Sequence, residues 1–137
     1  MRALFLDRDG VINVDVGYGY RIDQMEFVPG IFEFTKKFSD AGYAIVVVTN
    51  QAGIGRGYYS EADFHTLTQW MVGQFAARGV TITAVKFCPH HPQATLPQYQ
   101  VQCACRKPEP GMLNEAIAQF GIDATQSLMI GDEPPTC

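Results

Sequence analysis

The sequence predicts an α/β protein whose parallel sheet carries helices on both faces. Short apolar segments of strand length alternate with longer segments of helical periodicity, which is typical of strand-helix-strand units joined by right-handed crossovers. Residues 44–48 form an unbroken apolar, mostly branched run, as expected of a strand covered on both sides. Polar residues follow several of these strands directly, which favours a ligand site at one edge of the sheet.

Length and composition describe one ordinary globular domain. The 137 residues suit a single domain over 1–137 and are few for a complete doubly wound sheet. A hydrophobic content of 47% with 18% charged residues is that of a folded soluble protein. A net charge of −4 argues against nucleic-acid or membrane partners. The sequence has no membrane-length apolar run and no signal-peptide pattern, so we expect a monomer in the cytoplasm.

The first predicted strand, residues 3–6, ends at two carboxylates. Asp7 and Asp9 are separated by one residue, and Gly10 then releases the backbone into a loop. Because strand side chains alternate, both carboxylates are expected to point the same way. With little nearby to neutralise them, the two acids favour a hard cation such as Mg²⁺ and, through it, a phosphate. The alternative is a solvated loop start rich in aspartate, since D-x-D is a short pattern.

The chain then continues as loop, helix and strand. Residues 11–28 are polar, rich in glycine and tyrosine, and too long for a plain connection, so they are a candidate substrate cover. The strand at 44–48 ends at Thr49 and Asn50. Between the loop at 11–28 and the strand at 44–48, the spacing of apolar residues predicts a helix that ends at Gly42. Its expected inward face consists of Ile31, Phe34, Phe38 and Ala41.

A glycine-rich segment opens the second half. Residues 51–59 place three glycines around Arg56, which suits a flexible loop that brings backbone N–H groups and a guanidinium to an anion. Such glycines are also ordinary turn residues. A capping box at residues 60–63 predicts a helix that ends at Gly79, with an inward face of Phe64, Leu67, Met71 and Phe75. A strand at 80–87, a helix at 112–120 and a strand at 127–130 complete the pattern.

Three cysteines and a histidine have the composition of a zinc site. A cytosolic location disfavours disulfides, so clustered cysteines are better interpreted as metal ligands. Four such ligands complete a tetrahedral Zn²⁺ site with no position for water, which indicates a structural metal that holds a long loop. The alternative is a set of unrelated buried cysteines beside solvated histidines. The expected ligands are Cys88, His90, Cys103 and Cys105, with His91 as the alternative histidine and Cys137 as a free thiol.

Several motifs, in this order, resemble those of the haloacid dehalogenase-like phosphatases. They are Asp7-Arg8-Asp9-Gly10, Thr49-Asn50, Lys107 and Gly131-Asp132. The zinc segment is more narrowly similar to that of the zinc-containing heptose bisphosphate phosphatases of this family, through residues 88–92, 103–108 and 110–113. Segments 13–18 and 48–57 strengthen the similarity, which covers nearly the whole chain up to Asp132.

The resemblance implies a chemical role for each matching residue. Asp7 would be the nucleophile that forms an aspartyl-phosphate, and Asp9 would be the general acid and then the general base. Thr49 and Asn50 would hold the transferring phosphoryl group, while Lys107 would offset its charge.

The resemblance also implies metal ligands, substrate contacts and an activity. Mg²⁺ would be held by Asp7, the main-chain carbonyl of Asp9 and Asp132. Arg56 and Arg106 would contact the second phosphate or the sugar. The implied reaction removes the 7-phosphate of D-glycero-D-manno-heptose 1,7-bisphosphate on the pathway to ADP- or GDP-heptose, which supplies lipopolysaccharide core or surface glycans.

The end of the chain departs from the family pattern. Glu133 replaces a lysine, Thr136 replaces a second acid, and residues 134–135 are prolines that disfavour the expected helix. We expect a shortened or altered form of a longer enzyme, with reduced activity and an exposed apolar strand edge at 128–130. Two alternative functions stay open: a histidinol-phosphate phosphatase, whose domain shares the zinc loop, and a catalytically silent zinc-binding fragment.

Overall fold

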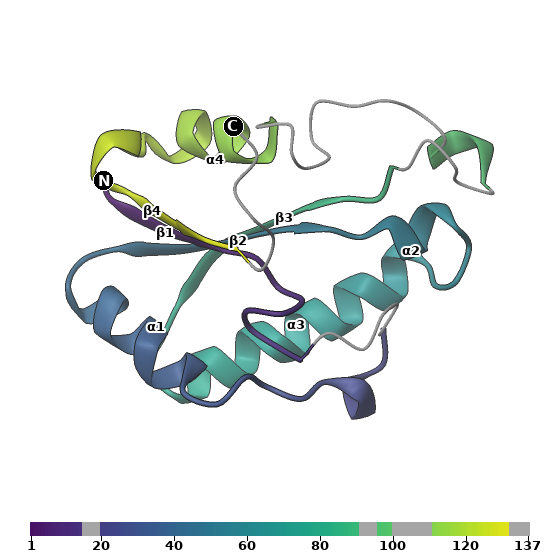
Figure 1. Ribbon diagram of the computed structural model, residues 1–137, viewed down its shortest axis with the longest axis horizontal. Helices are drawn as coiled ribbons and strands as arrows, with labels where there is room; N and C mark the ends of the chain where they lie inside the picture. The colour runs from purple at the N-terminus through teal and green to yellow at the C-terminus, as the bar shows by residue number, and fades with distance from the viewer. Residues whose placement is uncertain (15–19, 91–95, 100–110, 132–137) are drawn as a thin grey trace.

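A parallel four-stranded sheet forms the centre of the molecule (Figure 1). The computed structural model describes residues 1–14, 20–90, 96–99 and 111–131. In the order β3-β2-β1-β4, the strands are β3 (Ile82–Cys88), β2 (Ala44–Asn50), β1 (Ala3–Leu6) and β4 (Leu128–Ile130). The other elements are α1 (Ile31–Asp40), α2 (Ala52–Gly55), α3 (Glu61–Ala77), α4 (Gly111–Phe120), η1 (Ile22–Gln24), η2 (Pro97–Tyr99) and η3 (Ala124–Gln126).

Helices cover both faces of this sheet. Figure 1 shows α1 and α3 on one face and α4 on the other, which confirms the predicted α/β class. Among the described residues, no helix is both long and apolar enough to cross a bilayer. The alternation along β1 divides the core into two layers. The layer beneath α1 and α3 includes Leu4, Leu6, Ile45, Val47, Met71 and Phe75, and the layer beneath α4 includes Ala3, Phe5, Val46, Val48, Met112 and Ala116.

The strands differ in how well they are covered. All of β1 and residues 45–48 of β2 are buried, as expected of central strands with helices on both faces. Strand β4 pairs with β1 at an edge of the sheet, and its Leu128 and Met129 are 46% and 41% exposed. The expected exposed apolar edge at 128–130 is therefore confirmed at Leu128 and Met129, whereas Ile130 is partly buried.

The predicted inward face of α1 is wrong in part. Phe34 and Ala41 are exposed, whereas Thr35 is completely buried. The buried side of the helix follows Ile31, Thr35 and Phe38, a spacing of four and then three residues. Sequence reasoning left the threonine out because it is polar, but its hydroxyl donates to the Ile31 carbonyl one turn earlier and so needs no water.

The predicted start and buried face of α3 are confirmed. The Ser60 hydroxyl accepts from the Asp63 amide at 3.1 Å, and the Asp63 carboxylate accepts from the Ser60 amide at 3.0 Å. These bonds satisfy amides at the end of the helix that have no partner within it. The buried residues of α3 are those the spacing predicted: Phe64, Leu67, Met71 and Phe75.

The segment that follows β2 is more ordered than the sequence suggested. Residues expected to form a flexible glycine loop instead form the single-turn helix α2, and Gly53 and Gly55 are buried. Ile54 explains the difference, because it packs with Tyr59 and Phe64 in a small buried cluster. Of the three glycines, Gly57 alone has a positive φ, of 79°, where it reverses the chain after the helix.

Two phenylalanine substitutions compare the buried core beneath α1 and α3 with the exposed side of α1. Phe75 is fully buried against the rings of Phe27 and Phe32, so Phe75→Ala should lower the free energy of unfolding by about 3–5 kcal/mol. Phe34→Ala should lower it by about 1 kcal/mol or less, because Phe34 is 36% exposed. Urea denaturation measures both, and equal losses would contradict this arrangement of α1.

Candidate active site

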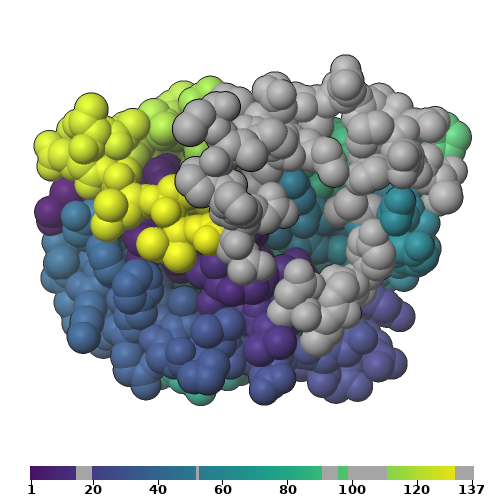
Figure 2. Space-filling model, in the orientation of Figure 1, coloured from purple at the N-terminus to yellow at the C-terminus, as the bar shows by residue number. Residues whose placement is uncertain are grey.

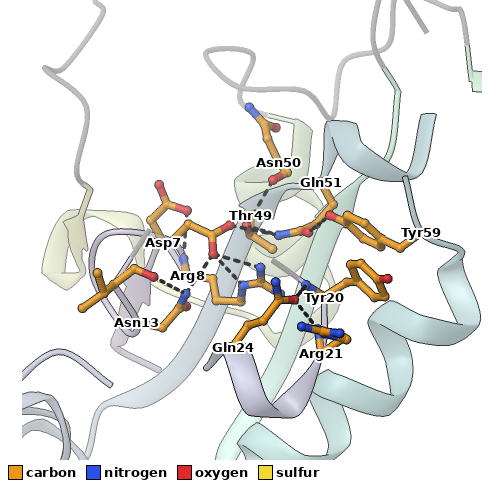
Figure 3. Close-up of polar contacts among 12 residues, drawn as sticks. Asp7, Arg8, Asn13, Tyr20, Arg21, Gln24, Thr49, Asn50, Gln51 and Tyr59 are labelled. Atoms are coloured by element: carbon orange, nitrogen blue, oxygen red, sulfur yellow. Dashed lines mark hydrogen bonds and ion pairs between the residues drawn. The ribbon is translucent and has the colours of Figure 1, made fainter. Parts of the chain in front are cut away.

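The carboxyl ends of three neighbouring strands bring the predicted site residues together. The register pairs Leu6 with Val47 and Asn50 with Cys88. Asp7 therefore follows β1 at the edge where β2 ends, and its amide donates to the Ile130 carbonyl of β4 at 3.0 Å. Figure 3 shows Asp7 close to Thr49 and Asn50 at this end of the sheet. The structure thus places Asp7, Thr49 and Asn50 at one edge of the sheet.

A tight turn follows β1 and fixes the second carboxylate. Gly10 adopts a φ of 89°, and its amide donates to the Asn13 carbonyl at 2.7 Å. The Arg8 carbonyl accepts from the amides of Ile12 at 2.8 Å and Asn13 at 3.2 Å. The turn brings the Asn13 side chain back toward the strand end, where its Nδ2 donates to Asp9 Oδ1 at 3.0 Å.

Arg8 neutralises Asp9, contrary to the expectation that the two acids have little charge compensation nearby. The guanidinium donates to Asp9 Oδ1 from Nε at 3.1 Å and from Nη2 at 2.9 Å. The Arg8 side chain is only 3% exposed and that of Asp9 is 23% exposed, so solvent screens the pair less than it screens a surface ion pair. Asp7 has a different environment, since its Oδ1 accepts from the Arg8 amide at 2.8 Å. The two carboxylates of the motif are therefore not equivalent.

A second group of hydrogen bonds connects the ends of β1 and β2 through Gln51. Its Nε2 donates to Thr49 Oγ1 at 3.0 Å and to Asp9 Oδ2 at 3.4 Å. The Tyr59 hydroxyl bonds to the Gln51 Oε1 from beyond α2 (Figure 3). Sequence reasoning used Gln51 only as part of a similarity and gave Tyr59 no role. The signal for Gln51 was its position two residues after Thr49, whereas no sequence pattern marked Tyr59.

The structure shows two of the expected zinc ligands close together. Cys88 Sγ lies 3.7 Å from His90 Nδ1. Two ligands of one tetrahedral zinc, with bonds of ~2.3 Å to sulfur and ~2.0 Å to nitrogen, would be about 3.5 Å apart. Cys103, Cys105 and the alternative His91 lie outside the described residues. Within the described part of the chain, no group of three or more His, Cys, Asp or Glu side chains could hold a metal ion.

The remaining predicted site residues divide between described and undescribed parts of the chain. Arg56 is half-buried and directly follows α2, on the segment that leaves the site edge. The predicted substrate contact Arg106, the charge-compensating Lys107 and the Mg²⁺ ligand Asp132 all lie outside the described residues, as do Glu133 and most of the motif at 13–18.

A mainly apolar hollow of about 440 Å³ lies beside the turn after β1. Figure 2 shows the segments that form its rim meeting on one face of the molecule. None of the residues that line it is charged, and neither Asp7 nor Asp9 is among them. This chemistry is unsuited to a phosphate. The lining residues are Gly10, Val11, Val28, Pro29, Gly30, Ile31, Phe34, Ile130 and Gly131.

The chain has the features of the class of HAD-like hydrolases. These are a parallel α/β sheet, a D-x-D pair after the central strand β1, and Thr-Asn at the end of the neighbouring strand β2. A family model described as "HAD-hyrolase-like" matches residues 104–136. The chain is 50% identical over 131 residues to D-glycero-beta-D-manno-heptose-1,7-bisphosphate 7-phosphatase of Photorhabdus laumondii, covering 96% of this chain and 70% of the relative. It is 52% identical over 132 residues to the D-glycero-alpha-D-manno enzyme of Burkholderia mallei, with the same coverage.

A solved structure agrees with these sequence similarities. The D,D-heptose 1,7-bisphosphate phosphatase from B. bronchiseptica, solved with magnesium and phosphate, superposes with a TM-score of 0.84 at 30% identity. The match covers 97% of this chain and 71% of that one. The chain therefore belongs to the D-glycero-D-manno-heptose-1,7-bisphosphate 7-phosphatase family of HAD-like hydrolases.

Replacing the Asp9 carboxylate should destabilise the fold as well as the site. Asp9→Asn removes the negative charge from the side chain to which the buried Arg8 guanidinium donates twice, so we expect the free energy of unfolding to fall by about 2–3 kcal/mol. The matched control is Asp23→Asn, whose ion pair with Arg21 is exposed and should change stability by less than about 0.5 kcal/mol. If urea denaturation gave both variants the same stability, the Arg8–Asp9 pair would not be the buried contact described.

Proposed function

We propose that the chain is a Mg²⁺-dependent phosphatase that removes the 7-phosphate of D-glycero-D-manno-heptose 1,7-bisphosphate. The observation that carries this proposal is the pair of unlike carboxylates, Asp7 and Asp9, at the sheet edge beside Thr49. Relatives of about half-identical sequence are named for this reaction, which favours it over histidinol phosphate hydrolysis. The chain spans about 70% of their length.

In the first step Asp7 acts as the nucleophile. One of its carboxylate oxygens forms a bond to phosphorus while the bond from phosphorus to the sugar oxygen breaks. Asp9 enters this step in its protonated form and donates that proton to the sugar oxygen as it leaves. The products of the step are an aspartyl-phosphate on Asp7, the free sugar hydroxyl and a deprotonated Asp9.

In the second step Asp9 acts as a base. It takes a proton from water, whose oxygen bonds to phosphorus as the bond to Asp7 breaks. Inorganic phosphate leaves, and both carboxylates return to their starting states. Thr49 and Asn50 at the end of β2 would hold the phosphoryl oxygens, and Lys107, outside the described residues, would add positive charge.

The donors at this edge suit magnesium. Asp7, the main-chain carbonyl of Asp9 and Asp132 would offer oxygen ligands, which Mg²⁺ prefers. The side chain of Asp9 is engaged by Arg8 and Asn13, which agrees with a metal contact through its backbone. When bound, the ion would offset charge on the transferring phosphoryl group. Of the two side chains proposed to bind Mg²⁺, Asp7 lies in the described part of the chain and Asp132 lies outside it.

Loss of the nucleophile should abolish phosphate release. Asp7→Asn should lower turnover of heptose 1,7-bisphosphate by about 10³-fold or more, and a chelator should stop the native chain until Mg²⁺ is restored. Both anomers are assayed because relatives of each kind match, and histidinol phosphate serves as the competing substrate. Asp40→Asn, a substitution at an exposed pair on α1, should keep full activity. Absence of release from any phosphomonoester by the native chain would instead support a silent binding fragment.

We further propose a structural Zn²⁺ bound by Cys88, His90, Cys103 and Cys105, in a single domain that works as a cytoplasmic monomer. The separation of Cys88 and His90 supports the first two ligands. The position of Cys88 opposite Asn50 would join such a metal directly to the edge that carries the catalytic residues. A long loop held in this way would also fix where Arg106 and Lys107 lie.

Measurements of metal content and thermal stability test the proposed zinc site. The purified chain should contain one zinc by elemental analysis, Cys88→Ser should lose it, and Cys137→Ser should retain it. Chelation should lower the thermal midpoint of the native chain but leave that of Cys88→Ser unchanged, because zinc binding contributes directly to folding. Native protein without zinc, or full zinc content in Cys88→Ser, would contradict the site.

A further inference from the structure

A buried amide connects the proton-transferring carboxylate to the rest of the site. Gln51 is only 2% exposed. Its side-chain Nε2 donates to both Asp9 Oδ2 and Thr49 Oγ1. Its main-chain N–H donates to the Cys88 carbonyl at 2.8 Å. One side chain thus contacts the acid from β1 and the phosphate-holding threonine from β2 (Figure 3).

The two oxygens of Asp9 have different surroundings. Oδ1 accepts three hydrogen bonds, two from the Arg8 guanidinium and one from Asn13. Within the described part of the chain, Oδ2 accepts only the long bond from Gln51, at 3.4 Å. An oxygen that already accepts three donors is poorly suited to carry a proton. Oδ2 is therefore the oxygen suited to give a proton to the leaving group and later to take one from water.

The orientation of the Gln51 amide depends on Tyr59. A primary amide can turn over and exchange its oxygen with its NH₂ group. In the turned orientation Gln51 Oε1 would face the Asp9 carboxylate that remains once the proton has been given up, and this ionised form can only accept hydrogen bonds. The Tyr59 hydroxyl holds Oε1 on the opposite side by donating to it. We propose that Gln51, oriented by Tyr59, is a positioning residue that aims Asp9 Oδ2 at the leaving-group oxygen.

Packing fixes Tyr59 without the help of its hydroxyl. Its ring stacks on Tyr20 with centroids 5.4 Å apart and an interplanar angle of 12°. It also packs with Ile54 and Phe64 in the small cluster beside α3. Tyr59→Phe should therefore keep the ring in place and remove one oxygen atom. The substitution therefore removes the hydrogen bond to Gln51 and keeps the packing of the ring.

The leaving group distinguishes positioning of the acid from a general structural effect. A sugar alkoxide needs a proton in order to leave, whereas p-nitrophenolate leaves well without one. Under the proposed function, Tyr59→Phe and Gln51→Leu should slow single-turnover release of the sugar by about tenfold or more. They should slow release of p-nitrophenol by less than about threefold, with KM nearly unchanged. Tyr43→Phe, on a tyrosine that packs with Phe38 at the start of β2, is the matched control and should change neither rate.

The outcomes separate this inference from the function on which it rests. Equal slowing of both esters by Tyr59→Phe would overturn the positioning role while leaving the phosphatase activity intact. A native chain inactive on both esters would overturn the proposed function and this inference with it.

A second readout needs no turnover: in protein labelled with ¹⁵N-glutamine, the Gln51 side-chain amide should exchange slowly with water. Tyr59→Phe should speed that exchange, and an unchanged rate would also overturn the inference.

Discussion

The ion pair between the buried Arg8 and the partly exposed Asp9 is the constraint on which the site depends. Arg8 is nearly inaccessible to water and must therefore keep a negative partner. The turn at Gly10 supplies that partner by bringing Asp9 and Asn13 together at the end of β1. The same pairing makes Asp9 different from Asp7, although the two residues look equivalent in the sequence. In the proposed mechanism, that difference would let one carboxylate attack phosphorus while the other transfers protons.

The candidate metal loop and the candidate active site share one piece of backbone. β3 ends at Cys88, which pairs with Asn50 of β2 and accepts from the Gln51 amide. A shift of Cys88 would therefore move Asn50 and Gln51 at the end of β2. In the proposed arrangement, a metal that only holds a loop still affects catalysis, because a small displacement of positioning groups is costly to the rate.

Much of the architecture followed from sequence patterns, and the differences have local physical causes. Continuous apolar runs and polar strand ends predicted the sheet and placed Asp7, Thr49 and Asn50 at its edge, since burial on two faces leaves a clear signal. The pattern misassigned Thr35, whose hydroxyl is satisfied within its own helix, and the helix around Ile54, which is stabilised by residues distant in sequence. The roles of Arg8 and Tyr59 depend on where side chains turn in three dimensions, which periodicity does not encode.

The central claim is that Asp7 carries the phosphoryl group and Asp9 does not. Rapid acid quenching of the chain with heptose 1,7-bisphosphate and Mg²⁺, followed by proteolysis and fragment mass spectrometry, would locate the phosphoryl group directly. The account predicts one phosphoryl group on Asp7. A phosphoryl group on Asp9, or turnover without any phosphorylated protein, would contradict it.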